Sequence, residues 1–209
     1  MQTKEFDPYI SYLASHLTPA RLQHSLGVMR VMQELASIYG LDSITAQTAG
    51  LLHDAGKELT QGQMIEIARA IHFPLIIPSD RDPLFLHGPA SAYVAAHDLG
   101  IDDPLILEAI FRHSFIGTGQ VQSPVFCWCL RFADFLEPGR DWDEAHDRLQ
   151  PLIYSGNMAE AALGLMDWLI PFLQSMQLAP HPGQFVLRQK LLQYLEDGTN
   201  EVGFDQIPV

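Results

Sequence analysis

Helix-start signals recur along this chain and constrain its fold more than any other feature. A capping residue is followed directly by proline at Thr18-Pro19, Asp103-Pro104 and Ser123-Pro124. Proline is favoured at the first helical position because its missing N–H would have no intrahelical partner there. Apolar residues then follow at helical spacing, as in Leu22, Leu26, Met29, Met32 and Leu35. Since we find no alternating strand pattern, the sequence predicts an all-α fold, a single helical bundle with additional C-terminal helices.

The same signals predict where individual helices begin and end. Asp42-Ser43 can cap a helix that stops at Gly56. The pattern Thr60-Gln61-Gly62-Gln63 is typical of a capping box that opens the next helix. His87-Gly88-Pro89 is expected to open a helix that ends at Gly100.

The C-terminal third is predicted to be helical as well. Asp141 to Glu144 and Asn157 to Glu160 have the pattern of capping boxes. Pro171 is expected to kink or split the helix that follows, because proline removes an intrahelical hydrogen bond. A last helix is expected from Gln184 to Glu196.

The chain is long enough for one sizeable core, with 209 residues of which 47% are hydrophobic. We divide it into a main domain, residues 1–178, and a C-terminal helix with a tail, residues 179–209. Residues 199–209 lack periodicity and are expected to be loose.

The charge of the chain excludes some classes of partner. The formal net charge is −13, which repels phosphate backbones and argues against nucleic-acid binding. An anionic substrate would therefore need local cations or a metal ion. We find neither the apolar core of a signal peptide nor an apolar run near the about 18 residues of a membrane span. We expect a cytoplasmic protein without membrane contact, and we leave a homodimer open.

A metal centre is predicted from the adjacent pair His53-Asp54, which ends an apolar run. Burying such a pair without a partner is costly. Four further residues lie at helix ends or on apolar helix faces: His24, His87, His113 and Asp134. Imidazole and carboxylate ligands together suit Fe, Mn, Co, Ni or Zn, and the absence of cysteine ligands argues against a structural zinc site. Mixed sites of this kind are more often catalytic than structural.

Each of these residues also has a simpler interpretation. A histidine on an apolar face, such as His24, is often a satisfied core residue. His87 could cap a helix, and His113 could be a C-terminal cation favoured by the helix dipole. Asp134 could pair with Arg131 or Arg140.

Other candidate residues have simpler interpretations still. Lys57 could be a helix C-terminal cation, Arg140 an exposed turn residue, and Arg21 a residue of a first helical turn. The two cysteines, Cys127 and Cys129, are best explained as small buried hydrophobic residues. The remaining histidines show no convergent pattern and are predicted to be surface or loop residues: His16, His72, His97, His146 and His181.

The order H…HD…H…H…D on helices resembles the HD superfamily of metal-dependent phosphohydrolases. The chain is most similar to the YqeK-like branch, which hydrolyses dinucleoside tetraphosphates symmetrically. The matching stretches are RLQHSLGV from Arg21, AGLLHDAGK from Ala49, LHGP from Leu86, Arg112-His113, and FADFLEPGR from Phe132 to Arg140. They cover roughly residues 20–142, and the last stretch is the most specific to the branch.

The resemblance implies roles for individual residues. His24, His53, Asp54 and Asp134 would hold a first metal ion, iron or manganese. His87 and His113 would complete a second metal site or contact phosphate, and the choice stays open. Arg21, Lys57 and Arg140 match positions expected near phosphates, with Asp54 and Lys57 as catalytic residues.

The implied reaction is attack of a metal-activated hydroxide on a β-phosphorus of diadenosine tetraphosphate, which releases two ADP. Three alternatives remain from the sequence. They are a phosphohydrolase of another nucleotide, an iron-dependent oxygenase on the same scaffold, and a non-enzymatic nucleotide-binding module. The cations Lys57 and Arg140 favour a phosphate substrate.

Overall fold

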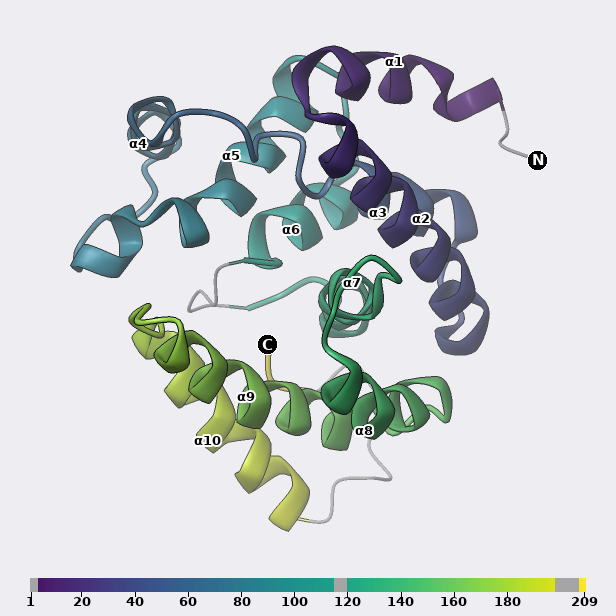
Figure 1. The fold of residues 1–209 in the computed structure, drawn as a ribbon, viewed down its shortest axis with the longest axis vertical. Helices are drawn as coiled ribbons and strands as arrows, with labels where there is room; N and C mark the ends of the chain where they lie inside the picture. The colour runs from purple at the N-terminus through teal and green to yellow at the C-terminus, as the bar shows by residue number, and fades with distance from the viewer. Residues whose placement is uncertain (1–3, 115–119, 198–206) are drawn as a thin grey trace.

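The protein folds into packed helices, with no strand in the part that the computed structural model describes, residues 4–114, 120–197 and 207–209 (Figure 1). The predicted all-α fold is confirmed. The α-helices are α1 (Asp7–His16), α2 (Pro19–Tyr39), α3 (Ser43–Leu52), α4 (Gln61–Ala70), α5 (Pro83–His97), α6 (Pro104–Arg112), α7 (Pro124–Leu136), α8 (Asp143–Tyr154), α9 (Met158–Ser175) and α10 (Pro182–Glu196). Two short 3-10 helices accompany them: η1 (Lys4–Phe6) precedes α1, and η2 (Pro78–Arg81) lies between α4 and α5.

Helix α3 lies at the centre of the main core. It packs against α1, α2, α6 and α7, and every residue from Ala46 to Leu52 is buried. The buried polar side chains of this stretch bond within the helix: Gln47 donates to the Ser43 carbonyl and Thr48 to the Ile44 carbonyl. The pair His53-Asp54 follows directly on this helix, so both side chains are deep in the molecule.

Helices α8, α9 and α10 form a second group, which faces α7 in Figure 1. Helix α10 packs on α9, and Leu187 and Leu191 of α10 belong to the main hydrophobic core. The chain end packs there too: Ile207 is buried, and Trp128 Nε1 donates a hydrogen bond to the Pro208 carbonyl at 2.8 Å. The prediction of a loose tail is therefore wrong for residues 207–209, while residues 199–206 lie outside the described residues.

Helix α5 begins earlier than predicted, at Pro83, with Asp82 as its cap. Pro89 lies inside it and cannot donate to the Phe85 carbonyl four residues back. The hydroxyl of Ser114 donates to that carbonyl instead, at 3.0 Å, and accepts a hydrogen bond from the Gly88 N–H at 2.9 Å. His87 is thus an interior helical residue and not a cap, and the helix ends at His97 rather than at Gly100.

Helix α3 also differs from its predicted length, because it ends at Leu52 and not at Gly56. Gly56 is needed for a different reason. A Cβ atom there would lie 2.9 Å from the backbone of Ala90 and Ser91 in α5. The turn after α3 can therefore press against α5, and the Gly56 N–H donates to Ser91 Oγ at 2.9 Å.

Several predicted caps are confirmed and others are wrong. Asp42, Asp103 and Ser123 accept cap hydrogen bonds, and the capping box at Thr60 is present. The side chains at the caps of α2, α8 and α9 make no cap hydrogen bond; these caps are Thr18, Trp142 and Asn157. The two capping boxes predicted near Asp141 and Asn157 are thus wrong.

Two further boundaries concern the C-terminal helices. Pro171 lies inside α9 and does not split it. Helix α10 begins at Pro182, two residues before the predicted start, because His181 caps it. Among the described helices, none has the length and the apolar character that crossing a membrane requires.

Candidate metal centre

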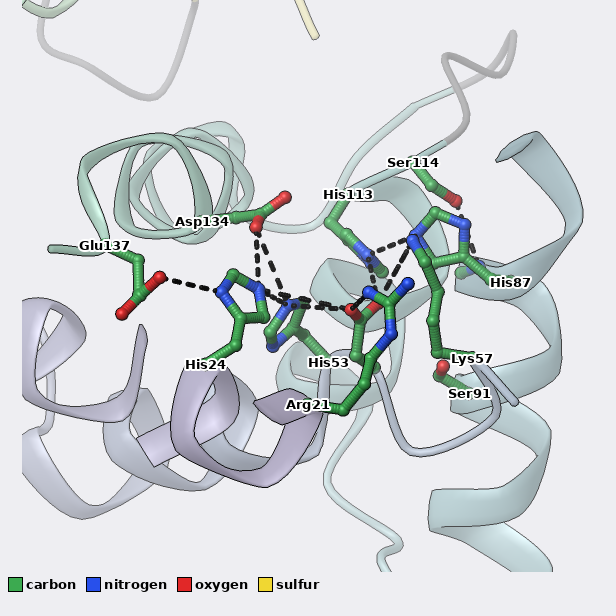
Figure 2. A network of polar contacts seen from close by, with 12 residues as sticks. Arg21, His24, His53, Lys57, His87, Ser91, His113, Ser114, Asp134 and Glu137 are labelled. Carbon is green, nitrogen blue, oxygen red and sulfur yellow. Dashed lines mark hydrogen bonds and ion pairs between the residues drawn. The ribbon is translucent and has the colours of Figure 1, made fainter. Parts of the chain in front are cut away.

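Six side chains from five helical segments converge on one point inside the bundle (Figure 2). Helix α2 supplies one, the turn after α3 two, and α5, the end of α6 and α7 one each. They are the six that the sequence predicts: His24, His53, Asp54, His87, His113 and Asp134. Their ligand atoms form two overlapping groups with all distances within 4.8 Å, namely His24, His53 and Asp134, and His53, Asp54 and His113.

The outer nitrogen of each histidine is held by an acceptor. Nδ1 of His53 bonds the Gly50 carbonyl at 2.8 Å, and Nδ1 of His113 bonds the Ile110 carbonyl at 2.6 Å. Nδ1 of His87 bonds the Pro83 carbonyl at 3.2 Å. A carbonyl can only accept, so Nδ1 must carry the proton in each ring. The neutral ring then presents the unprotonated Nε2 to the centre.

These inward nitrogens meet in pairs that cannot bond each other. His24 Nε2 lies 3.2 Å from His53 Nε2, and His87 Nε2 lies 3.0 Å from His113 Nε2. In the neutral rings both atoms of each pair are acceptors, so no hydrogen bond forms between them. Lone pairs that face each other at this distance are stabilised by a cation, which is the arrangement of a metal site.

Asp54 stands between the two pairs and offers one oxygen to each. Its Oδ2 lies 3.7 Å from His53 Nε2, and its Oδ1 lies 3.4 Å from His87 Nε2 and 3.6 Å from His113 Nε2. Among the described residues Oδ1 has no hydrogen-bond partner of good geometry, although it is buried. A buried carboxylate oxygen without a hydrogen-bond donor fits the role of a ligand to a cation. The residues present therefore fit a divalent metal ion with nitrogen and oxygen ligands.

Burial and charge set the protonation of the centre. Burial lowers the pKa of His53 to about 4 and keeps its ring neutral. Burial alone would raise the pKa of Asp54, but the ammonium group of Lys57 outweighs it and holds that pKa well below its usual range. Burial likewise opposes charge on His24, yet Asp134 raises its pKa, so a proton and a metal ion compete for Nε2.

Three cations surround the centre at different depths. Lys57 is the deepest, and its ammonium donates to His87 Nε2 at 2.8 Å and lies 3.5 Å from Asp54 Oδ1. Arg21 reaches Asp54 Oδ2 from the rim at 3.5 Å, with over a third of its side chain exposed. Both cations therefore contact residues of the centre, and their predicted role near phosphates stays a prediction.

Arg140 is the third cation and pairs with Asp134 through Nη2. The guanidinium also stacks over Trp142, 4.8 Å from the ring centroid. Of the two partners considered for Asp134, Arg140 is the one observed. Arg131 instead donates Nε and Nη2 to the Arg112 carbonyl, at 3.3 and 2.8 Å.

One residue of the centre was missed by sequence reasoning. Glu137 is buried, and its Oε2 accepts a hydrogen bond from His24 Nδ1 at 3.0 Å. Its carboxylate fills the space above Gly27, where a Cβ atom would overlap it. Two signals could have found it. Glu137 lies three residues after Asp134 in the branch-specific stretch, and Gly27 leaves room one turn after His24.

Comparisons with known proteins agree with this geometry. Residues 21–145 match the HD domain family. The chain is 33% identical over 132 residues to a symmetrical bis(5'-nucleosyl)-tetraphosphatase of Halalkalibacterium halodurans, covering 61% of this chain and 66% of that protein. It is 30% identical over 131 residues to the Bacillus subtilis protein of the same name, covering 63% and 68%. The match thus spans about two thirds of the length of these relatives.

A solved structure resembles the fold over most of its length. This is a predicted HD superfamily hydrolase involved in NAD metabolism from Clostridium acetobutylicum, with a TM-score of 0.80 and 32% identity. The similarity covers 90% of this chain and 97% of the other, and so includes helices beyond residue 145. The histidines and aspartates that meet at the centre of the bundle, together with these matches, show that the chain belongs to the HD domain family.

Proposed function

We propose that this protein is a metal-dependent phosphohydrolase that cleaves diadenosine tetraphosphate and related dinucleoside tetraphosphates symmetrically into two nucleoside diphosphates. The observation that carries the proposal is the convergence of four inward imidazole nitrogens on Asp54 and Asp134, with three cations at the edge. The names of the relatives supply the substrate.

The residues divide the work of the reaction. When bound, divalent metal ions polarise phosphoryl oxygens and lower the pKa of water. Asp54 holds the two halves of the site together, since each of its oxygens faces a different pair of histidines. Arg140 offers a planar fork and Lys57 a point charge to oxygens on which negative charge develops. Burial keeps water from screening these charges.

We propose that the site would hold two metal ions, because each oxygen of Asp54 faces a different pair of histidines. His24, His53 and Asp134 would serve one ion, and His87 and His113 the other. Lys57 competes for His87 because its ammonium already donates to Nε2. The variant His87→Ala decides the matter: loss of one metal equivalent supports the second ion, whereas unchanged metal content assigns His87 to phosphate binding.

Iron as the native metal and a cytoplasmic location belong to the proposal as well, and the formation of a homodimer is left open. Iron fits the mixed nitrogen and oxygen ligands. The cytoplasm is consistent with the two buried free cysteines. Metal analysis of anaerobically purified protein, fractionation of cells and sedimentation equilibrium test these three points in turn.

The main experiment supplies diadenosine tetraphosphate with Fe²⁺, Mn²⁺ or Co²⁺ under reducing conditions and separates the products. Two ADP are expected, whereas ATP with AMP would show an asymmetrical cut. No turnover with any of these metals would refute the substrate. Oxygen uptake without release of ADP or phosphate would support an oxygenase instead, which the cations Lys57, Arg140 and Arg21 disfavour.

A further inference from the structure

A pocket opens beside the metal centre, between α7 and the second group of helices. His113 and Asp134 of the centre line one side of it, and Leu165, Trp168 and Leu169 of α9 line the other. It encloses about 110 Å³, well above the ~15 Å³ that one water needs. Part of a ligand at the metal centre can therefore enter this pocket.

Two indole rings give the pocket an aromatic character. Trp142 and Trp168 both line it, lie 4.7 Å apart and are partly exposed. Trp142 carries the Arg140 guanidinium on its ring, and Arg140 in turn bonds Asp134. A continuous series of contacts thus leads from the metal centre to the indoles, and aromatic rings are the surfaces on which nucleobases stack.

A buried cation lies in the wall of the same pocket. Arg131 is only 6% exposed, and in the described part of the chain its Nη1 has no hydrogen-bond partner. Burial lowers its pKa to about 10, so it stays charged at neutral pH. The chain carries a net charge of −13, so the buried positive charge of Arg131 next to the metal centre contrasts with the acidic character of the whole protein. An adjacent anionic group would compensate that charge.

We propose that this pocket, the indole pocket, holds one nucleoside of the substrate, with its base against Trp142 and Trp168 and its nearest phosphate beside Arg131. The inference rests on the proposed function and gives a share in nucleoside recognition to α9, which carries Trp168 and lies outside the stretch that matches the HD domain family. The pocket makes the enzyme select a nucleotide over a bare phosphate chain.

The test compares two ligands that carry the same number of phosphates. ADP has one nucleoside and inorganic pyrophosphate has none, and calorimetry measures the binding of each to the metal-loaded protein. Wild type should bind ADP more tightly than pyrophosphate. Trp168→Leu should weaken ADP about tenfold to a hundredfold, the usual size of base–aromatic stacking, and leave pyrophosphate unchanged.

Phe172→Leu is the matched control. Phe172 stacks on Trp168 in the same aromatic cluster, with centroids 4.7 Å apart, but does not line the pocket. Its replacement should change neither affinity. Because Trp168→Leu could lose stability, Leu169→Trp is the second variant. It keeps the existing aromatic cluster and fills the pocket with an uncharged side chain, so the same selective loss of ADP is expected.

Either of two results would overturn the assignment. One is that wild type binds ADP no more tightly than pyrophosphate. The other is that the pocket variants weaken both ligands equally or neither. Failure of the proposed function looks different, because wild type would then release no ADP from diadenosine tetraphosphate while the difference between ADP and pyrophosphate binding persists.

Discussion

The protein buries histidine next to aspartate in two places, and the two places differ in how the polar atoms are satisfied. In the metal centre, four imidazole Nε2 atoms face one another and Asp54 Oδ1 has no good partner among the described residues. Near the start of α10, His181 Nε2 lies 2.6 Å from Asp80 Oδ1, and the Gly183 N–H donates to His181 Nδ1. Asp80 Oδ2 accepts two more hydrogen bonds, from the backbone N–H groups of Ile76 and Ile77.

The difference is one of tautomers. In the centre Nδ1 donates and Nε2 is left as an acceptor, whereas His181 accepts at Nδ1 and must donate from Nε2. Burial and residue type are the same in both places, so neither distinguishes a metal ligand from a structural histidine. What distinguishes them is the group that meets Nδ1 of the ring. It is an acceptor in the metal centre, whereas at His181 it is a backbone N–H donor.

The largest expected effect comes from Asp54→Ala. Removing the carboxylate between the two histidine pairs should lower kcat/KM by roughly three orders of magnitude or more and remove most bound metal. Helix content should change little, because Asp54 Oδ1 makes no good hydrogen bond with any described group. Turnover assays, metal analysis and circular dichroism measure the three effects, and full activity would contradict the role given to Asp54.

Asp80→Ala should give the opposite result. It leaves the His181 N–H and two backbone N–H groups without their acceptor, at a cost of about 3 kcal/mol in the free energy of unfolding. Metal content should stay at the wild-type level. Denaturant unfolding and metal analysis of the same preparation decide this, and loss of metal without loss of stability would erase the distinction between the two regions.

Glu137→Gln should have an intermediate effect on the metal centre. Glu137 accepts from both His24 Nδ1 and the Gly139 N–H, and an amide cannot accept with its nitrogen. If that nitrogen turns to His24, the ring must protonate Nε2 instead, which blocks the ligand atom. Metal affinity should fall about tenfold to a hundredfold, as a competition titration would show.

Gly27→Ala tests the same contact from the other side, because its methyl group would overlap the Glu137 carboxylate. Glu144→Gln, on the exposed face of α8, is the matched control and should bind metal like wild type. An unchanged affinity in both Glu137→Gln and Gly27→Ala would show that Glu137 does not orient His24.

The smallest effect is expected for Arg188→Ala. Arg188 pairs with Asp167 at 2.6 Å between α10 and α9, with more than a third of each side chain exposed. Exposed pairs contribute about 0–1 kcal/mol, so thermal unfolding should shift little and metal content not at all. If Arg188→Ala lowered the free energy of unfolding as much as Asp80→Ala, exposed and buried ion pairs would contribute equally to stability, contrary to this expectation.

The sequence is informative about the centre where spacing and chemistry coincide. Helix starts with proline and a capping residue correctly predict where α2, α6 and α7 begin. The six residues predicted as ligands do meet in space. Their roles as ligands stay a prediction. His181 was predicted to lie on the surface or in a loop; it does lie in the connection before α10, but it is buried and caps that helix, so a surface position is wrong.

The remaining errors have a common physical reason, which is contact between distant segments. Glu137 bonds His24 across 113 positions of the chain, and Asp80 bonds His181 across 101. Pro89 suggests a helix start because local chemistry makes it a helix breaker, yet a hydroxyl from Ser114 satisfies the carbonyl that the proline leaves unpaired. Local patterns contain no information about such partners.

The Ser114 hydroxyl has a consequence for binding that goes beyond helix continuity. The hydroxyl donates to the Phe85 carbonyl and accepts from the Gly88 N–H, so it holds the backbone on either side of His87. Ser114 itself directly follows His113 in the chain. The two histidines are therefore fixed relative to each other before any ligand arrives. Two independently moving side chains would lose conformational entropy when they bind a ligand. Here that entropy is already lost when the protein folds, so binding does not have to supply it. Because Pro89 leaves the Phe85 carbonyl free for Ser114, the proline contributes to the preorganisation of a site to which both α5 and the end of α6 supply a histidine.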